Sequence, residues 1–238
     1  MKKKVLVLGA SGLIGPNLTS GLEPYYDLLL TDIAPHPDGK AITACDITSF
    51  EQVRQAAQGM DAIINATVNR SHPDHSFHVN TKGARNVMQA AAELGIKKVI
   101  HTGPQFVRGT YDHDFNVVDV PRLGGINYYV LTKMLASEIC QIYARTHGIQ
   151  TVSFVFNGLG PRPTEKVTQT DFPPFTVVWE DLQLACRLAL ELESVPDDFQ
   201  EFNMLSYVGH GKYSIEKAKR ILGFEPTQQW ERYFERTP

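Results

Sequence analysis

Short apolar runs alternate along the chain with segments whose apolar positions recur at the spacing of an amphipathic helix. Continuous apolar runs of this length are typical of parallel strands that are buried on both faces. The strands predicted in this way cover residues 5–8, 28–31, 42–45, 61–66, 98–102, 150–156 and, late in the chain, 202–208. The helices predicted between them cover residues 13–22, 49–58, 77–94, 128–147, 180–193 and 214–223. This alternation predicts an α/β chain with a parallel sheet.

Local signals mark several of the boundaries between these elements. Ser49 and Gln52 have the spacing of a capping box at the start of a helix. Gly95 stands in the C-cap position of the long helix that precedes the strand at 98–102. Prolines and glycines interrupt residues 103–127 and 158–174, which are predicted to be loops. The first of them is long enough to predict a functional role rather than a simple connection.

The composition narrows the class of protein. A chain of 238 residues is long enough for one large domain, or for one domain with a small appendage. Its 23 basic and 26 acidic side chains give a net charge of -3, so it offers no overall positive field for nucleic acid or an anionic membrane. We therefore expect a small-molecule partner, and neither a nucleic-acid nor a membrane partner.

The start of the chain and its cysteines bear on where the protein works. Three lysines precede the first apolar run as in a secretory signal, but the run stops at Gly9, so a strand is the better interpretation. Cys45, Cys140 and Cys186 show neither CxxC spacing nor a disulfide framework, so we expect them to pack in the core. Such unpaired cysteines suit a reducing compartment, and the predicted location is cytoplasmic.

The strongest chemical signal is a glycine-rich turn between the first strand and the first helix. Gly9, Gly12 and Gly15 have the spacing that lets backbone N–H groups approach a pyrophosphate at a helix N-terminus. Asp32 ends the second strand about twenty residues on, where a carboxylate can accept hydrogen bonds from both ribose hydroxyls of adenosine. Because that carboxylate would repel a 2′-phosphate and Lys40 is the nearest cation downstream, the sequence predicts NAD rather than NADP as the cofactor.

A second signal lies on the predicted helix 128–147. Tyr129 and Lys133 are one helical turn apart, so both side chains project from the same face. A free phenol has a pKa near 10, and a neighbouring ammonium group would lower it toward neutral pH. The pair is therefore a candidate for proton transfer.

Together these motifs resemble the extended short-chain dehydrogenase/reductase family, of the NAD-dependent epimerase/dehydratase type, over nearly the whole chain. Besides the residues above, the matching segments are Asp46-Ile47, Asn65-Ala66-Thr67, residues 80–84, Glu138, residues 157–161 and residues 215–226. The resemblance implies a Rossmann-type doubly wound sheet, with residues 1–157 binding NAD. It also implies that residues 158–238 form a short substrate-side and C-terminal segment packed as one structural unit with the rest.

The resemblance also implies which residues bind the cofactor. They are Gly9, Ser11, Gly12, Leu13, Ile14, Gly15, Asp32, Ile33, Asp46, Ile47, Ala66, Thr67, Lys133 and Asn157. In such a site Tyr129 exchanges the hydroxyl proton of the substrate, and Lys133 holds the ribose and lowers the pKa of the tyrosine. A homodimer built through the helix that carries Tyr129 is expected by resemblance only.

The sequence departs from the family at the residue that hydrogen-bonds the substrate oxygen. The family usually has serines after the fifth strand, whereas this chain has His101-Thr102-Gly103-Pro104. Thr102 is the nearest replacement, and a shift of the loop could instead bring Gln105 to the substrate. The departure leaves two functions open: an NAD-dependent oxidoreductase or epimerase, and a dinucleotide-binding sensor or interaction protein with impaired catalysis.

Other polar residues are weaker candidates. Arg108 and Arg162 lie in the predicted loops and could each bind a carboxylate or a phosphate. His72, His75 and His78 suggest a metal site, but no carboxylate or thiol set accompanies them, so no metal is expected. Residues 31–35 also resemble the uronate dehydrogenases of the family, which favours a sugar or sugar acid as substrate. Extended members of the family are usually longer, and the shortfall lies between Pro161 and Trp179, so the resemblance implies a small substrate cap.

Overall fold

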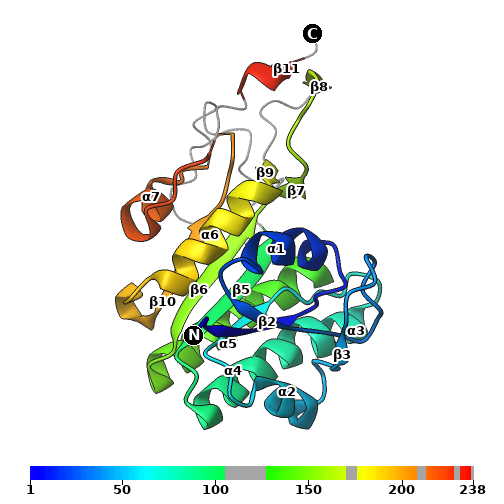
Figure 1. Ribbon diagram of the computed structural model, residues 1–238, viewed down its shortest axis with the longest axis vertical. Helices are drawn as coiled ribbons and strands as arrows, with labels where there is room; N and C mark the ends of the chain where they lie inside the picture. The colour runs from blue at the N-terminus through cyan, green and yellow to red at the C-terminus, as the bar shows by residue number, and fades with distance from the viewer. Residues whose placement is uncertain (105–126, 170–175, 208–212, 228–230, 237–238) are drawn as a thin grey trace.

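A seven-stranded sheet in which every neighbouring pair is parallel forms the centre of the computed structural model (Figure 1). The structure describes residues 1–104, 127–169, 176–207, 213–227 and 231–236. The strands of the sheet are β1 (Lys4–Leu8), β2 (Asp27–Asp32), β3 (Thr43–Ala44), β4 (Ala62–Asn65), β5 (Lys98–Pro104), β6 (Gln150–Phe156) and β10 (Phe199–Asn203). Their order, β10-β6-β5-β4-β1-β2-β3, reverses direction between β1 and β4 and confirms the predicted doubly wound sheet.

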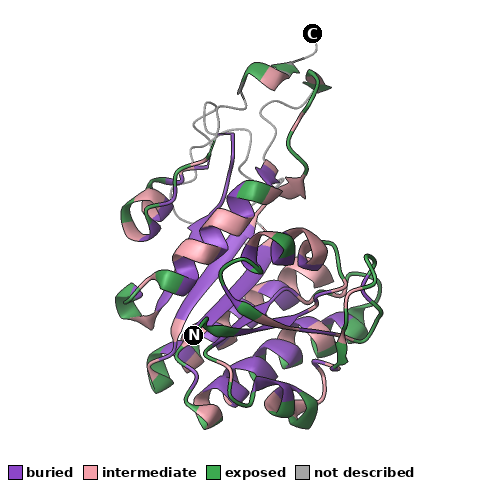
Figure 2. Cartoon of the chain, in the orientation of Figure 1, coloured by how far each residue is buried: buried purple, intermediate pink, exposed green. Residues whose placement is uncertain are grey.

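Helices cover both faces of the sheet. One face packs against α1 (Ile14–Leu22), α6 (Trp179–Glu191) and α7 (Glu216–Leu222), and the other against α2 (Phe50–Ala57), α4 (Gly83–Leu94) and α5 (Tyr128–His147). Val5 and Val7 of β1 point into the first layer, whereas Leu6 and Leu8 point into the second. Figure 2 shows the central strands buried between these layers. Burial on both faces is the reason why the strands are continuous apolar runs in the sequence.

The sequence prediction fails where a helix departs from regular geometry. A single helix was expected over residues 77–94, but the structure has α3 (Pro73–Ser76), a π-helical turn η1 (Phe77–Lys82) and only then α4. The wider turn carries Asn80, whose side chain leaves the helix to bind the backbone of Asn69. Hydrophobic periodicity does not distinguish a π-turn from an α-turn, since the apolar face continues across both.

The C-terminal part corrects two further predictions. Residues 158–174 were predicted as a loop, but β7 (Gly158–Gly160) pairs with β9 (Thr176–Val178) and β8 (Val167–Gln169) pairs with β11 (Phe234–Arg236). The late strand was expected at 202–208, whereas β10 occupies Phe199–Asn203 because its register is fixed by pairing with β6. The described residues also include two short 3₁₀ turns, η2 (Pro196–Asp198) and η3 (Glu231–Tyr233). Of the predicted loop 103–127, residues 105–126 lie outside the described residues.

No helix in the described part of the chain combines the length and the apolar character needed to cross a membrane.

His101 is a buried polar residue for which the described part of the chain provides no partner. It lies on β5 at 1% exposure, and neither ring nitrogen has a hydrogen-bond partner among the described residues. Burial and the nearby Lys133 ammonium hold its pKa well below 6.5, so the folded protein carries a neutral imidazole. An unfolded chain would bind a proton at this residue below pH 6.5, so His101 opposes folding increasingly as the pH falls.

We therefore predict that His101→Leu stabilises the protein. Removing the unpaired nitrogens should raise the free energy of unfolding at pH 8 by about 1–2 kcal/mol. The advantage should grow as the pH falls below 6.5, because the leucine cannot bind a proton in the unfolded chain. Urea unfolding of both proteins between pH 5 and pH 8 measures this. A variant less stable than the wild type at pH 5 would contradict the prediction.

Candidate cofactor and active site

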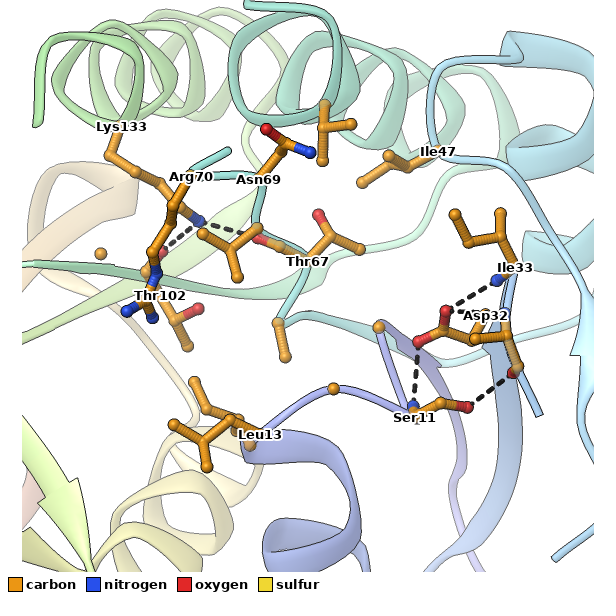
Figure 3. A pocket seen from close by; sticks show the side chains of 18 of the residues that line it. Ser11, Leu13, Asp32, Ile33, Ile47, Thr67, Asn69, Arg70, Thr102 and Lys133 are labelled. Atoms are coloured by element: carbon orange, nitrogen blue, oxygen red, sulfur yellow. Dashed lines mark hydrogen bonds between the residues drawn. The ribbon is translucent and has the colours of Figure 1, made fainter. Parts of the chain in front are cut away.

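A pocket of about 340 Å³ opens at the carboxyl edge of the sheet, where the strand order reverses. The ends of β1, β2, β4 and β5 contribute to it, and so does the first turn of α5. Figure 3 shows Asp32 and Ser11 at one end of the pocket and Lys133, Thr102 and Arg70 at the other. The predicted residues that line it are Gly9, Ser11, Gly12, Leu13, Ile14, Asp32, Ile33, Asp46, Ile47, Ala66, Thr67, Thr102, Tyr129 and Lys133.

The glycine turn brings the backbone close to its neighbours. Gly9 has φ +82°, and a Cβ there would lie 2.9 Å from the backbone nitrogen of Thr67. Gly15 does not line the pocket; a Cβ at this position would lie 2.2 Å from the carbonyl oxygen of Ala10. Gly15 therefore allows α1 to start directly against the turn, which leaves the helix N-terminus facing the pocket.

The Asp32 carboxylate is held by three backbone N–H groups. Its Oδ2 accepts from Ser11 at 2.9 Å, and its Oδ1 accepts from Ile33 at 2.7 Å and from Ala34 at 3.1 Å. A carboxylate has about four acceptor sites, so one remains for a ligand in the pocket. Lys40 forms an ion pair with Glu23.

Asp46 is fixed by a contact that changes the predicted capping box. Ser49 caps α2 as expected by accepting from the backbone of Gln52. The Gln52 side chain does not reach back to Ser49 but accepts from the backbone N–H of Asp46 at 2.8 Å. Asn86 of α4 donates to the carbonyl oxygen of Ile47 at 2.9 Å. These contacts hold the Asp46–Ile47 backbone at the same end of the pocket as Asp32.

Tyr129 and Lys133 enter the pocket from the first turns of α5. Asn127 caps the helix by accepting from the backbone of Tyr129 at 2.9 Å, which fixes the start of the helix. The Lys133 ammonium donates to the carbonyl oxygens of Thr67 and Thr102, each at 2.9 Å. Complete burial lowers the pKa of Lys133 to about 8, and burial raises the pKa of Tyr129 above its usual value.

Thr102 lines the pocket, but its hydroxyl group already donates a hydrogen bond within the protein. Its Oγ1 donates to the carbonyl oxygen of Asn65 at 3.2 Å, and the residue is 3% exposed. The oxygen can therefore accept a hydrogen bond from a substrate hydroxyl, whereas donating to a substrate would require breaking the bond to Asn65.

A model of the NAD dependent epimerase/dehydratase family matches residues 5–174, more than half of the 238 residues. The chain belongs to this family. The matched residues include the glycine turn, Asp32, Tyr129 and Lys133.

Relatives within the family include two uronate dehydrogenases. The protein from Pseudomonas syringae pv. tomato is 29% identical over 171 residues, which cover 68% of this chain and 62% of that protein. The protein from Pseudomonas putida is 30% identical over 169 residues, covering 67% of this chain and 62% of that protein. The matched segment thus spans about three fifths of each relative.

Solved structures of family members share the fold. A uronate dehydrogenase variant from Agrobacterium tumefaciens in complex with NAD superposes with a TM-score of 0.83 at 18% identity, covering 98% of this chain and 88% of that chain. A glucuronic acid dehydrogenase from Chromohalobacter salexigens gives a TM-score of 0.83 at 21% identity, covering 98% of this chain and 87% of that chain. At these identities the superposition establishes the architecture.

Several residues predicted for the site lie away from this pocket. Asn157 is not among the residues that line it, although Phe156 before it and Leu159 after it are. Arg162 is exposed and lines a second pocket, which shares Leu159 with the first. Gln105 and Arg108 lie outside the described residues.

The three histidines form no metal-binding group within the described ranges. The His72 ring nitrogen accepts from the backbone of Asp74 at 3.3 Å and so caps α3. The rings of His72 and His75 lie 5.3 Å apart between their centroids.

Among the described residues, the structure adds two polar ones that the sequence motifs did not single out. Asn69 and Arg70 line the pocket from the loop that follows β4, and the Arg70 guanidinium lies 4.9 Å from the centroid of the Tyr129 ring. A signal was available, since the loop directly follows the matched Asn65–Thr67 segment at the carboxyl end of a strand.

The residues of the pocket fit a dinucleotide. A side chain at Gly9 would collide with the backbone after β4, so glycine at this position leaves room for a ligand beside the turn. Asp32, on the opposite side, retains one acceptor site. The helix N-terminus between them favours an anionic group. Ser11, Gly12 and Leu13 would hold a pyrophosphate, and Asp32 would hold the adenosine ribose.

Proposed function

We propose that this chain is an NAD-dependent oxidoreductase or epimerase that acts on the hydroxyl/carbonyl pair of a small polar substrate, a sugar or a sugar acid. One observation carries the proposal: Tyr129 and Lys133 line the same pocket as the glycine turn and Asp32. A proton-transfer pair thus lies within the site that fits the dinucleotide. The names of the uronate dehydrogenase relatives support the substrate class.

Tyr129 is the acid/base of the proposed reaction. In the direction of oxidation, its phenolate accepts the proton of the substrate hydroxyl while the hydrogen on the same carbon leaves as hydride. A bound nicotinamide would supply the acceptor for that hydride and, in an epimerase, would return it to the other face of the carbon. In the direction of reduction, the Tyr129 hydroxyl donates the proton to the forming alkoxide.

Arg70 supplies positive charge near the phenol. Arg70 lowers the pKa of Tyr129, opposing the larger effect of burial, which raises it. The Lys133 ammonium is fixed by the carbonyl oxygens of Thr67 and Thr102. Removing the proton from Tyr129 in the free protein therefore requires a higher pH than for a solvated phenol, and the rate of oxidation should rise with pH.

A dinucleotide-binding sensor with impaired catalysis is the second candidate function. The observation that favours it is the Thr102 hydroxyl, which already donates to Asn65 and so cannot also donate to a substrate oxygen. Gly103 and Pro104, which follow it, have no hydroxyl.

Incubation with NAD and a panel of uronates and aldoses, followed by NADH absorbance, tests the choice between these functions. The same panel offered to NADH-loaded protein as lactones or carbonyl compounds tests the reverse direction, and product stereochemistry identifies an epimerase. Appearance of NADH, or inversion at one carbon, supports the enzyme. Tight NAD binding without turnover of any compound would overturn it in favour of the sensor.

The Asp32 carboxylate should determine which dinucleotide binds. Replacing it by Asn removes the charge that would repel a 2′-phosphate and places an amide group against backbone N–H donors. We expect NAD to bind about 10-fold more weakly and the preference over NADP to shrink. Dissociation constants for both dinucleotides, measured by fluorescence titration, check this. Asp27→Asn at the opposite end of β2 is the matched control, and wild-type protein that binds NADP more tightly than NAD would contradict the assignment.

A further inference from the structure

Arg70 lines the pocket, and no acidic residue in the described part of the chain forms an ion pair with it. Among the residues that the structure describes, four charged ones line this pocket: Asp32, Asp46, Lys133 and Arg70. Both acids lie at the end that fits adenosine, as the backbone bond from Cys45 N to Asp32 O at 3.1 Å shows. Lys133 is buried and donates to two carbonyl oxygens. The Arg70 guanidinium has no ion pair with any described residue, and Figure 3 shows it at the reactive end of the pocket.

The backbone on both sides of Arg70 is fixed by side chains from other elements. Asn80 accepts from the N–H of Asn69 and donates to its carbonyl oxygen, both at 2.9 Å, and Ser76 donates to the same oxygen at 3.0 Å. The Tyr128 hydroxyl donates to the carbonyl oxygen of Arg70 at 2.6 Å. Asn80 is 2% exposed and Ser76 is fully buried. These contacts fix the position from which the Arg70 side chain starts.

The Arg70 guanidinium lies against the ring of Tyr129, the proposed acid/base. Its Cζ lies 4.9 Å from the centroid of the Tyr129 ring, which is the distance of a cation–π contact. Stacking on a ring leaves the N–H groups at the guanidinium edge free to donate, and a planar fork of donors matches a carboxylate or a phosphate. A substrate whose hydroxyl reaches Tyr129 would have an anionic group within range of this fork.

We propose that Arg70 binds the anionic group of the substrate and so makes the site selective for a sugar carrying a carboxylate or phosphate over the neutral sugar. This inference rests on the proposed function and deepens it. Arg108 and Arg162 were the arginines that the sequence suggested for this role. Arg162 lines the neighbouring pocket, whereas Arg70 contacts the ring of the acid/base itself.

The test compares a uronate with the aldose that differs only in having CH2OH in place of the carboxylate, using the full-length protein with NAD. Arg70→Met should lower kcat/KM for the uronate about 30-fold more than for the aldose, the loss expected for a charge-assisted hydrogen bond. The ratio isolates the anion contact, because any effect of Arg70 on the Tyr129 proton is common to both substrates. Arg70→Lys should restore part of the preference. Arg187→Met, which removes an arginine stacked 4.5 Å from the Tyr25 ring, is the control and should leave the ratio unchanged.

The positive charge of Arg70 gives a second test, the pH dependence of the rate. Arg70 lowers the pKa of Tyr129, so Arg70→Met should move the rising limb of the pH–rate profile to higher pH with either substrate. A loss of packing alone would lower the rate at every pH without moving this limb.

A binding measurement separates this proposal from the proposed function. Calorimetric titration of the NADH-bound protein with the uronate needs no turnover. Weaker binding to Arg70→Met than to the wild type, without hydride transfer in either, would support the anion site and overturn the oxidoreductase. Turnover of both sugars with an unchanged preference, or wild-type protein that binds the uronate no better than the aldose, would overturn the role of Arg70. A phosphorylated aldose titrated in parallel distinguishes a phosphate from a carboxylate as the preferred anion.

Discussion

Tyr129→Phe should lower kcat about 10²- to 10⁴-fold while NAD binding and the melting temperature stay close to those of the wild type. The loss is the range expected when a positioned acid/base is removed. The phenylalanine keeps the ring that lies under the Arg70 guanidinium, so the loop after β4 keeps its contact. Cofactor affinity should survive because the residues that fit the dinucleotide lie mainly on β1, β2 and β4 and the turns after them.

The pH dependence gives this prediction a second criterion. Burial raises the pKa of Tyr129, so wild-type oxidation should accelerate as the pH rises, and the residual activity of Tyr129→Phe should lack that limb. Tyr143→Phe is the matched control, since Tyr143 lies on the same helix and packs near His147 with 5.5 Å between the ring centroids. A Tyr129→Phe protein that turns over its substrate at the native rate would show that another group transfers the proton.

Gly15→Ala should reduce both the stability of the protein and its affinity for NAD. Alanine in place of glycine usually stabilises a helix, by about 0.5–1 kcal/mol. Here the added Cβ would lie 2.2 Å from the carbonyl oxygen of Ala10, so the turn and α1 must move apart. Overpacking of this kind costs about 3 kcal/mol, which corresponds to a fall in the melting temperature of about 10 °C for a domain of this size. Calorimetry and NAD titration measure the two effects.

Gly12→Ala separates the two roles of the glycine turn. A Cβ at Gly12 would meet only the carbonyl oxygen of Gly9, at an ordinary distance of 3.5 Å, so the fold should tolerate it. The same methyl group would stand in the pocket where the pyrophosphate is proposed to approach, so NAD affinity should fall with little change in melting temperature. A Gly15→Ala protein as stable as Gly12→Ala would disprove the steric assignment.

Elements whose burial follows one regular pattern along their length are predictable from this sequence. β6 and α5 have the predicted bounds, and the parallel sheet has the form that the alternation of strand and helix predicts. Apart from the π-helical turn at Phe77–Lys82, the predictions that fail concern pairings between distant segments. β7 and β8 exist because β9 and β11 hydrogen-bond to them, and β10 is placed by its register against β6. Three-residue strands leave no periodic pattern that could reveal a partner far along the chain.

The site residues also divide into those that the sequence predicts and those that it does not. The glycine turn and Asp32 are recognisable because each is a local solution to one physical problem, which is to bring backbone and charge to the end of a strand. Tyr129 and Lys133 are recognisable because helical spacing alone places them on one face. Arg70 is not recognisable by spacing, since its position depends on Asn80, which the π-turn directs to the loop after β4, and on Tyr128 at the start of α5.

The sequence by itself therefore determined the fold class, the face of the helix that carries the proton-transfer pair and the end of the sheet where a dinucleotide fits. These features depend on residues that are close in the chain, where backbone geometry fixes the distances. Only the tertiary structure decided that the Thr102 hydroxyl is used by Asn65 and that Arg70 contacts Tyr129. Both depend on atoms brought together from separate elements, because packing and hydrogen bonding across the sheet edge set those distances and the order of residues along the chain does not.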